Sequence, residues 1–257
     1  MKVSICINVD TRPENPVAEK MFNGTVNEDY LTDGVFNKIK FFDGFEKEVI
    51  VFVDEHLPLS QKAHDYLLSM ADTLVIRQHT NEPSFNDWNY IRCLQLASGD
   101  VVAHFDQDTA AFTSSKQKVD DLIGLLDNYA YVSYPSYWSP NAVDDPSFNY
   151  KWVSTRFFMC KRETLNFPET IKCLTDYDYF VGKYMPSRVC PWTEHFLGLI
   201  AGSNVIYPPL DVDNITIFSF DKYEKGTLQR LNNQTYDEVK QFIISRGGLH
   251  YPCDLTC

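Results

Sequence analysis

An apolar run that ends in two closely spaced carboxylates, within residues 96–109, constrains the fold of this chain more than any other stretch. Ser98 and Gly99 end a predicted helix, and the apolar run at residues 101–105 suits a buried strand. Ligands of open α/β sheets gather at the carboxyl ends of strands. We therefore expect Asp106 and Asp108 to hold a hard divalent cation, which would leave other coordination positions for water and the phosphates of a substrate.

Strands and helices alternate through the first hundred residues. Apolar runs rich in β-branched residues predict buried strands at residues 3–9, 49–53 and 74–76. Apolar side chains recur at helical spacing between them, and Ser60 can cap the second of these helices. The predicted helical stripes consist of Leu31, Val35, Ile39 and Phe42, then Ala63, Leu67, Met70 and Ala71, then Trp88, Ile91, Leu94 and Ala97. This order predicts a parallel, doubly wound sheet with polar residues at the strand ends.

The second half of the chain is less regular. Ser114 or Ser115 can cap a helix that points Val119, Leu122, Ile123 and Leu126 inward. A strand is predicted at residues 156–160, a helix at residues 193–201 closed by Gly202, and a strand at residues 205–207. A capping box at residues 235–238 begins a last helix, which the glycines at 247 and 248 end. We expect this half to shape the pocket of an acceptor molecule.

Composition narrows the class of protein. The chain has 257 residues, 44% of them hydrophobic, which is enough for one large domain or one domain with an appendage. The formal net charge of −12 argues against nucleic acid or an anionic membrane as the main partner, because both would be repelled.

The seven cysteines include no Cys-x-x-Cys pair, which indicates a reduced, intracellular chain without a zinc site. No signal-peptide pattern and no transmembrane run of 18 apolar residues occurs, so we expect a soluble, cytoplasmic protein, with peripheral membrane association left open.

Three segments together resemble a known family. They are the strand end that leads into residues 8–14, the acidic end of the second strand at Asp54 and Glu55, and the Ala-Ser-Gly-Asp plus Asp-x-Asp stretch. In this order they resemble the nucleotide-binding half of GT-A-fold glycosyltransferases of family 2. The resemblance covers residues 1–112 well. It implies an α/β, Rossmann-like GT-A domain with a mainly parallel central sheet flanked by helices. This domain would span residues 1–215, with an acceptor half at 113–215 and a C-terminal helical extension at 216–257.

The resemblance also implies the roles of individual residues. The Asp-x-Asp pair would bind Mn²⁺ or Mg²⁺ bridging the diphosphate of the donor, and His250 could fold back as a third metal ligand. Apart from the resemblance, Arg77 follows the third predicted strand, where a basic side chain could reach the nucleotide or could lie in a solvated loop. The residues expected to contact the nucleotide-sugar are Asn8, Asp10, Thr11, Arg12, Asp54, Arg77, Asp106 and Gln107. We expect UDP rather than GDP as the nucleotide, although the first strand lacks the Tyr that usually packs beside the base.

The family's usual catalytic base does not appear in standard form. Glu194 is the favoured candidate, because its distance along the chain from Asp108 suits the family and the dipole of its predicted helix would keep it ionised. Asp176 and Asp178 are the alternatives. The base would deprotonate a hydroxyl of a glycan or glycoconjugate acceptor, which predicts an inverting, single-displacement transfer.

Two other classes of function stay open. A nucleotidyltransferase that makes activated sugars shares the alternating plan, but it would normally carry a glycine-rich loop after the first strand, where this chain has residues 10–13. A non-catalytic relative that binds nucleotide or carbohydrate would bind a donor without turning it over. The oligomeric state is not predicted.

Overall fold

The structure is a computed structural model, and it describes residues 1–11, 28–78, 85–106, 109–113, 115–133, 151, 153–184, 193–208 and 215–219. The predicted helix after residue 235, and with it His250, lies outside the described residues. So do Arg12, Gln107 and Asp108.

Four parallel strands form one half of the central sheet, as the sequence predicts. They are β1 (Lys2–Asp10), β2 (Glu46–Glu55), β3 (Thr73–Gln78) and β4 (Val101–Asp106). Their order in the sheet is β3-β2-β1-β4, so the chain steps outward from β1 to β3 and then returns to the other side of β1. The neighbouring strands pair in parallel along their length, which brings the carboxyl ends of all four to one edge of the sheet.

The other half of the sheet is mixed. Strand β7 (Phe157–Lys161) pairs antiparallel with β4, β6 (Tyr131–Ser133) pairs antiparallel with β7, and β8 (Val205–Ile206) pairs parallel with β6. The seven strands therefore follow the order β3-β2-β1-β4-β7-β6-β8. Four of the six pairings are parallel, which confirms the expectation of a mainly parallel sheet.

A second, small sheet was not expected from the sequence. Strand β5 (Thr109–Thr113) pairs antiparallel with β9 (Ile215–Ser219). The boundary expected after residue 215 therefore falls at the first residue of β9, a strand that pairs with β5 about a hundred residues earlier in the chain. The division into a domain and a C-terminal extension stays a prediction.

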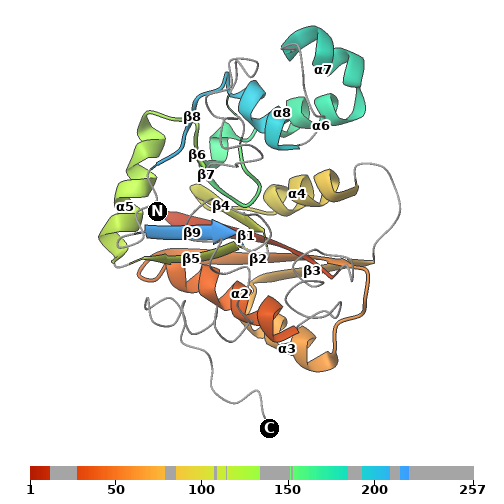
Figure 1. Ribbon diagram of the computed structural model, residues 1–257, viewed down its shortest axis with the longest axis vertical. Coiled ribbons are helices and arrows are strands. Elements are labelled where there is room, and N and C mark those ends of the chain that lie inside the picture. Colours follow the sequence, from red (N-terminus) through yellow and green to blue (C-terminus); the bar gives the residue numbers. More distant parts are fainter. Residues whose placement is uncertain are drawn as a thin grey trace, which may run out of the picture.

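Helices cover both faces of the central sheet (Figure 1). Helices α2 (Glu28–Phe41) and α3 (Gln61–Met70) lie on one face, and α4 (Phe85–Gln95) lies on the other. Helix α5 (Lys116–Gly124) packs Val119 and Leu122 into the same core as α2. Ser60 caps α3 as predicted, because its side chain accepts a hydrogen bond from the Ala63 amide. Each face of the sheet thus has its own apolar core.

Three further helices gather at one end of the molecule (Figure 1). They are α6 (Phe167–Thr175), α7 (Tyr177–Tyr184) and α8 (Thr193–Ile200). Cys173, Phe180 and Phe196 join them in a separate apolar cluster. Gly202 follows α8 with φ of +62°, a left-handed conformation that suits glycine and ends the helix as expected. Two short 3₁₀ helices, η1 (Leu125–Asp127) and η2 (Arg162–Thr164), complete the described elements.

The Ala-Ser-Gly-Asp stretch has a structural reason at the amino end of β4. A Cβ atom at Gly99 would lie 2.7 Å from the carbonyl oxygen of Lys2 and 2.9 Å from the amide nitrogen of Ser4. The Gly99 amide donates to the Ser4 hydroxyl over 2.7 Å, and that hydroxyl donates to Glu48 over 2.5 Å. This glycine therefore allows the chain to enter β4 tightly against β1.

No helix in the described part of the chain has the length and apolar character needed to cross a membrane.

Candidate functional site

The candidate site lies where the strand order reverses, between β1 and β4. The connection from β1 moves outward to β2, whereas β4 lies on the opposite side of β1. In open α/β sheets, such a reversal leaves a crevice beyond the carboxyl ends of the two strands, and ligands bind there. Asn8 of β1 lies beside Asp106 of β4 in the strand register. Asp10, Asp54 and Arg77 form a second row across β1, β2 and β3 at the same edge.

Asp106 ends β4 and is held by the turn that precedes β7. Its amide donates to the carbonyl oxygen of Arg156 over 3.2 Å, and its Oδ2 accepts a hydrogen bond of 3.2 Å from the Thr155 hydroxyl. The hydroxyl of Thr109, at the start of β5, donates to the same Arg156 carbonyl over 3.0 Å. One turn therefore fixes the chain on both sides of the segment that contains Gln107 and Asp108.

Asn8 is joined to a histidine that the sequence did not single out. His104 Nε2 lies 3.1 Å from Asn8 Oδ1, and the imidazole is fully buried. The ring stacks on Phe158 at a centroid distance of 5.1 Å and meets the edge of Tyr90 at 5.2 Å. Burial lowers the pKa of His104 to about 3, although a main-chain group of Thr155 acts in the opposite direction. The imidazole is therefore neutral at physiological pH.

Asp54 and Thr11 organise the ends of β2 and β1. Asp54 is 5% exposed, and its Oδ2 lies 3.6 Å from His56 Nε2. Thr11 is fully buried, and its hydroxyl donates to the Leu57 carbonyl over 3.0 Å while accepting from the His56 and Leu57 amides. Its hydroxyl is thus occupied by the loop after β2, so Thr11 shapes this corner of the site through that loop.

The candidate bases lie in the second half of the chain. Glu194 is in the first turn of α8, as expected, and its side chain is not among the described ones. Asp176 and Asp178 are exposed. The Asp176 carboxylate accepts a hydrogen bond of 2.8 Å from the Tyr179 amide at the start of α7, and Asp178 lies in the first turn of that helix. Asp176 therefore has a structural role at the beginning of α7.

The described residues test only part of a metal site. Among them, no group of three or more His, Cys, Asp or Glu side chains could hold a metal ion. Asp106 supplies a carboxylate at the carboxyl edge of the sheet, and oxygen donors of this kind suit Mg²⁺ or Mn²⁺. The other expected ligands, Asp108 and His250, lie outside the described residues. Of the expected ligands, Asp106 alone is described, and its carboxylate is of the kind that binds a hard divalent cation.

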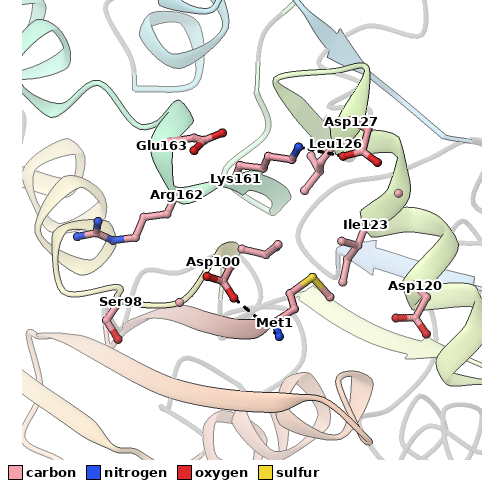
Figure 2. A pocket seen from close by; sticks show the side chains of 13 residues that line it. Met1, Ser98, Asp100, Asp120, Ile123, Leu126, Asp127, Lys161, Arg162 and Glu163 are labelled. Atoms are coloured by element: carbon pink, nitrogen blue, oxygen red, sulfur yellow. Dashed lines mark hydrogen bonds and ion pairs between the residues drawn. The ribbon is translucent and has the colours of Figure 1, made fainter.

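A cavity of about 620 Å³ lies at the opposite edge of the sheet (Figure 2). It surrounds Asp100 at the amino end of β4 and includes Asp127 and Lys161, which form an ion pair of 2.9 Å. Arg162 points away from this ion pair in Figure 2, and its Nε donates to the Ala97 carbonyl over 2.7 Å. The cavity is separate from the Asn8 and Asp106 edge, because β4 runs between them.

Three residues of the candidate site were not predicted from the sequence: His104, Thr155 and Arg156. Alternation along a strand could have found His104, because residues two apart point to the same face and His104 precedes Asp106 by two positions. Thr155 and Arg156 reach the site through pairing of β7 with β4, a contact between segments some fifty residues apart that no local pattern signals.

Comparison with known proteins identifies the fold. No protein-family model and no curated protein matches the chain. The apo-form glycosyltransferase GlyE of Streptococcus pneumoniae TIGR4 matches with a TM-score of 0.52 and 10% identity, over 97% of this chain and 65% of that chain. Another GlyE structure matches with a TM-score of 0.50 and 8% identity, over 96% and 64% of the respective chains.

The mannosyltransferase PcManGT from Pyrobaculum calidifontis, solved with GDP-Man and Mn²⁺, has a TM-score of 0.42 and 17% identity, over 80% of this chain and 54% of that chain. This chain thus spans 54% to 65% of the length of these solved proteins. The likeness to GlyE, together with the seven-stranded sheet and its flanking helices, identifies the GT-A fold of glycosyltransferases.

Proposed function

We propose that this chain is a metal-dependent glycosyltransferase that moves a sugar from a nucleoside-diphosphate sugar to a hydroxyl of a glycan or glycoconjugate. The observation that carries the proposal is the pairing of Asn8 with Asp106 at the strand reversal of a GT-A fold. A donor placed in this crevice meets the carboxyl ends of four parallel strands at once. UDP is the expected nucleotide, and GDP is the alternative to be tested beside it.

The first four strands supply the nucleotide pocket in this proposal. Asp54 and Arg77 lie next to each other across β2 and β3, so a carboxylate for hydroxyl groups and a cation for phosphate lie at one edge. Thr11 contributes by holding the loop after β2. The residues proposed to contact or position the nucleotide-sugar are Asn8, Asp10, Thr11, Arg12, Asp54, Arg77, Asp106 and Gln107.

Asp106 and Asp108 are the proposed metal ligands, with His250 as a third. A divalent cation bound there would neutralise charge that develops on the departing diphosphate. The turn at Thr155 and Arg156 keeps the Asp106 carboxylate in one orientation through the hydroxyl and carbonyl contacts described above. Preorganisation of this kind lowers the cost of rearranging the site during the reaction.

Glu194 is the proposed base, and it would accept the proton of the acceptor hydroxyl as that oxygen attacks the sugar. Its position in the first turn of α8 favours the ionised carboxylate, because the amino end of a helix carries partial positive charge. Attack on the face opposite the leaving diphosphate gives inversion. Asp176 and Asp178 are the alternatives, and the bond between Asp176 and the Tyr179 amide makes Asp176 the less available of the two.

Release of nucleoside diphosphate from a panel of UDP- and GDP-sugars, with and without Mn²⁺, tests the proposal. We expect metal-dependent release by the wild-type chain, loss of that release in Asp108→Ala, and loss of transfer with unchanged nucleotide affinity in Glu194→Gln. Full metal-dependent release in Asp108→Ala would contradict the metal assignment. Full transfer in Glu194→Gln would move the base to Asp176 or Asp178, and nucleotide binding without turnover of any donor would favour a non-catalytic binding protein.

A further inference from the structure

A buried row of side chains connects the interior of the sheet to the candidate site. Cys6 of β1 and Val102 of β4 belong to the apolar core on the α4 face. Residues two apart along a strand point to the same face, so Asn8 continues the row of Cys6, and His104 and Asp106 continue the row of Val102. His104 therefore lies directly beneath the Asn8 and Asp106 pair, on the same face of the sheet.

The surroundings of His104 fix the plane of its ring. Phe158 is its cross-strand neighbour and stacks on the ring with an interplanar angle of 14°, while Tyr90 of α4 closes the other side. Neither aromatic ring can rotate out of a close-packed core without opening a void. The plane of the imidazole is thus set by packing, and its Nε2 is directed at Asn8 Oδ1 over 3.1 Å.

The hydrogen bond fixes how Asn8 presents its amide. In the orientation seen here the Asn8 oxygen faces the imidazole and can only accept, and with this orientation the imidazole carries its proton on Nε2 and donates it. With Oδ1 occupied in this way, the Nδ2 group of Asn8 points away from His104. Among the described residues, Nδ2 has no hydrogen-bond partner, and Asn8 is half-buried at the strand end beside Asp106. Within the described part of the chain, both N–H groups of Nδ2 are thus left for a bound nucleotide-sugar.

We propose that His104 is a positioning residue for the donor site, which turns the Asn8 amide so that its N–H groups bind oxygen atoms of the nucleoside diphosphate. The inference rests on the proposed function, since it needs a nucleotide in this crevice. A carboxamide free to flip would offer its oxygen to the negatively charged diphosphate in half of its orientations. When the N–H groups of Asn8 are fixed toward the ligand, that repulsion is avoided. The entropy cost of ordering the side chain on binding is avoided as well.

Two substitutions of His104 separate hydrogen bonding from packing. His104→Phe keeps an aromatic ring between Phe158 and Tyr90 but cannot donate, whereas His104→Gln can place an amide N–H near the position of Nε2. We expect His104→Phe to raise the dissociation constant for UDP or GDP with Mn²⁺ roughly five- to tenfold, the range of one net hydrogen bond. His104→Gln should stay within roughly threefold of the wild type. If His104 acted only through packing, His104→Gln would bind the nucleotide more weakly than His104→Phe.

Isothermal titration with UDP and GDP, each with Mn²⁺, measures these constants for the wild type, both His104 variants, Asn8→Ala and the double variant His104→Phe/Asn8→Ala. The double variant should bind as weakly as Asn8→Ala alone, because both changes remove the same interaction. Val102→Ala is the matched control: it removes buried contacts from the same strand and face and should leave the dissociation constant unchanged.

The outcomes distinguish this inference from the proposed function. If the wild-type chain binds neither UDP nor GDP, both the proposed function and the role of His104 are overturned. Wild-type chain that binds nucleotide while His104→Phe binds equally well, or additive losses in the double variant, overturn the role of His104 alone. A second measurement does not depend on a folded variant: ¹⁵N NMR of the wild-type imidazole should show the proton on Nε2, and a proton on Nδ1 would overturn the inference.

Discussion

The buried imidazole of His104 makes the stability of the fold depend on pH. Burial lowers its pKa from 6.5 to about 3 in the folded chain. The unfolded chain therefore takes up a proton as the pH falls below 6.5, while the folded chain excludes it. We expect this residue to reduce the free energy of unfolding progressively between these two values, by up to about 1.4 kcal/mol per pH unit.

Urea denaturation of the wild type and His104→Gln at several pH values isolates this contribution, because glutamine does not titrate. The difference in unfolding free energy between the two chains should change in favour of the variant as the pH falls from about 7 to about 4. A difference that stays constant over this range would show that His104 is protonated equally in the folded and unfolded chains.

At the scale of elements, the close approach of the β4 entry to β1 depends on Gly99. A side chain there would meet main-chain atoms of Lys2 and Ser4 at less than 3 Å, and main-chain atoms of a central strand cannot move aside. We expect Gly99→Ala to lower the free energy of unfolding by about 1–3 kcal/mol, the usual cost of overpacking. Thermal unfolding monitored by circular dichroism measures the change.

Gly182 of α7 provides a matched control. It lies within a helix, and a Cβ atom there would have no neighbour within 4 Å. Gly182→Ala should therefore raise the free energy of unfolding by about 0.5–1 kcal/mol, because alanine loses less backbone entropy in a helix. Equal effects of the two substitutions would contradict the steric account of Gly99.

The helices and strands that could be predicted from the sequence are those marked by an apolar run or a capping residue in their own segment. Strands β1, β2 and β4 each contain a run of mostly apolar residues, and α3 begins after its expected Ser60 cap. Strands β5 and β9 lack such runs and are paired with each other from about a hundred residues apart, so their sheet depends on tertiary contact.

Helix α6 shows that one available signal was overlooked. Asn166 accepts a hydrogen bond from the Glu169 amide, and a proline lies in the first turn. This combination is typical of the beginning of a helix. The next helix, α7, is only eight residues long and rich in aromatic side chains, so its periodicity is weak.

The residues of the candidate site that could be predicted from the sequence are those at the ends of predicted strands. Three of its residues, Asp54, Arg77 and Asp106, lie at or next to the last residue of strands that the sequence located, and the register brings them to one edge. The roles of Thr11 and Thr155 depend on which main-chain groups their hydroxyls meet after folding. Such contacts between distant segments have no signature in spacing or composition.

At the scale of the whole molecule, the amino and carboxyl edges of the central sheet differ in the polar contacts that their residues make. The amino edge holds Gly99, Ser4 and Glu48 in a hydrogen-bonded cluster that joins β1, β2 and the entry to β4. Hydrogen bonds from Ser4 and Ser98 outweigh the effect of burial and hold the pKa of Glu48 at about 2. The carboxyl edge presents Asn8 and Asp106 beside each other. Substitutions at the two edges should therefore separate stability from ligand binding.

The most direct test of the proposed nucleotide and metal site is calorimetric titration of UDP and GDP, with and without Mn²⁺, into the wild type, Asp106→Asn and Asp127→Asn. Asp127 is an exposed partner of Lys161 at the opposite edge and serves as the control. We predict that Mn²⁺ strengthens nucleotide binding to the wild type and to Asp127→Asn, and that Asp106→Asn loses about tenfold or more of that affinity. Nucleotide binding that is the same in all three chains and independent of Mn²⁺ would contradict the account.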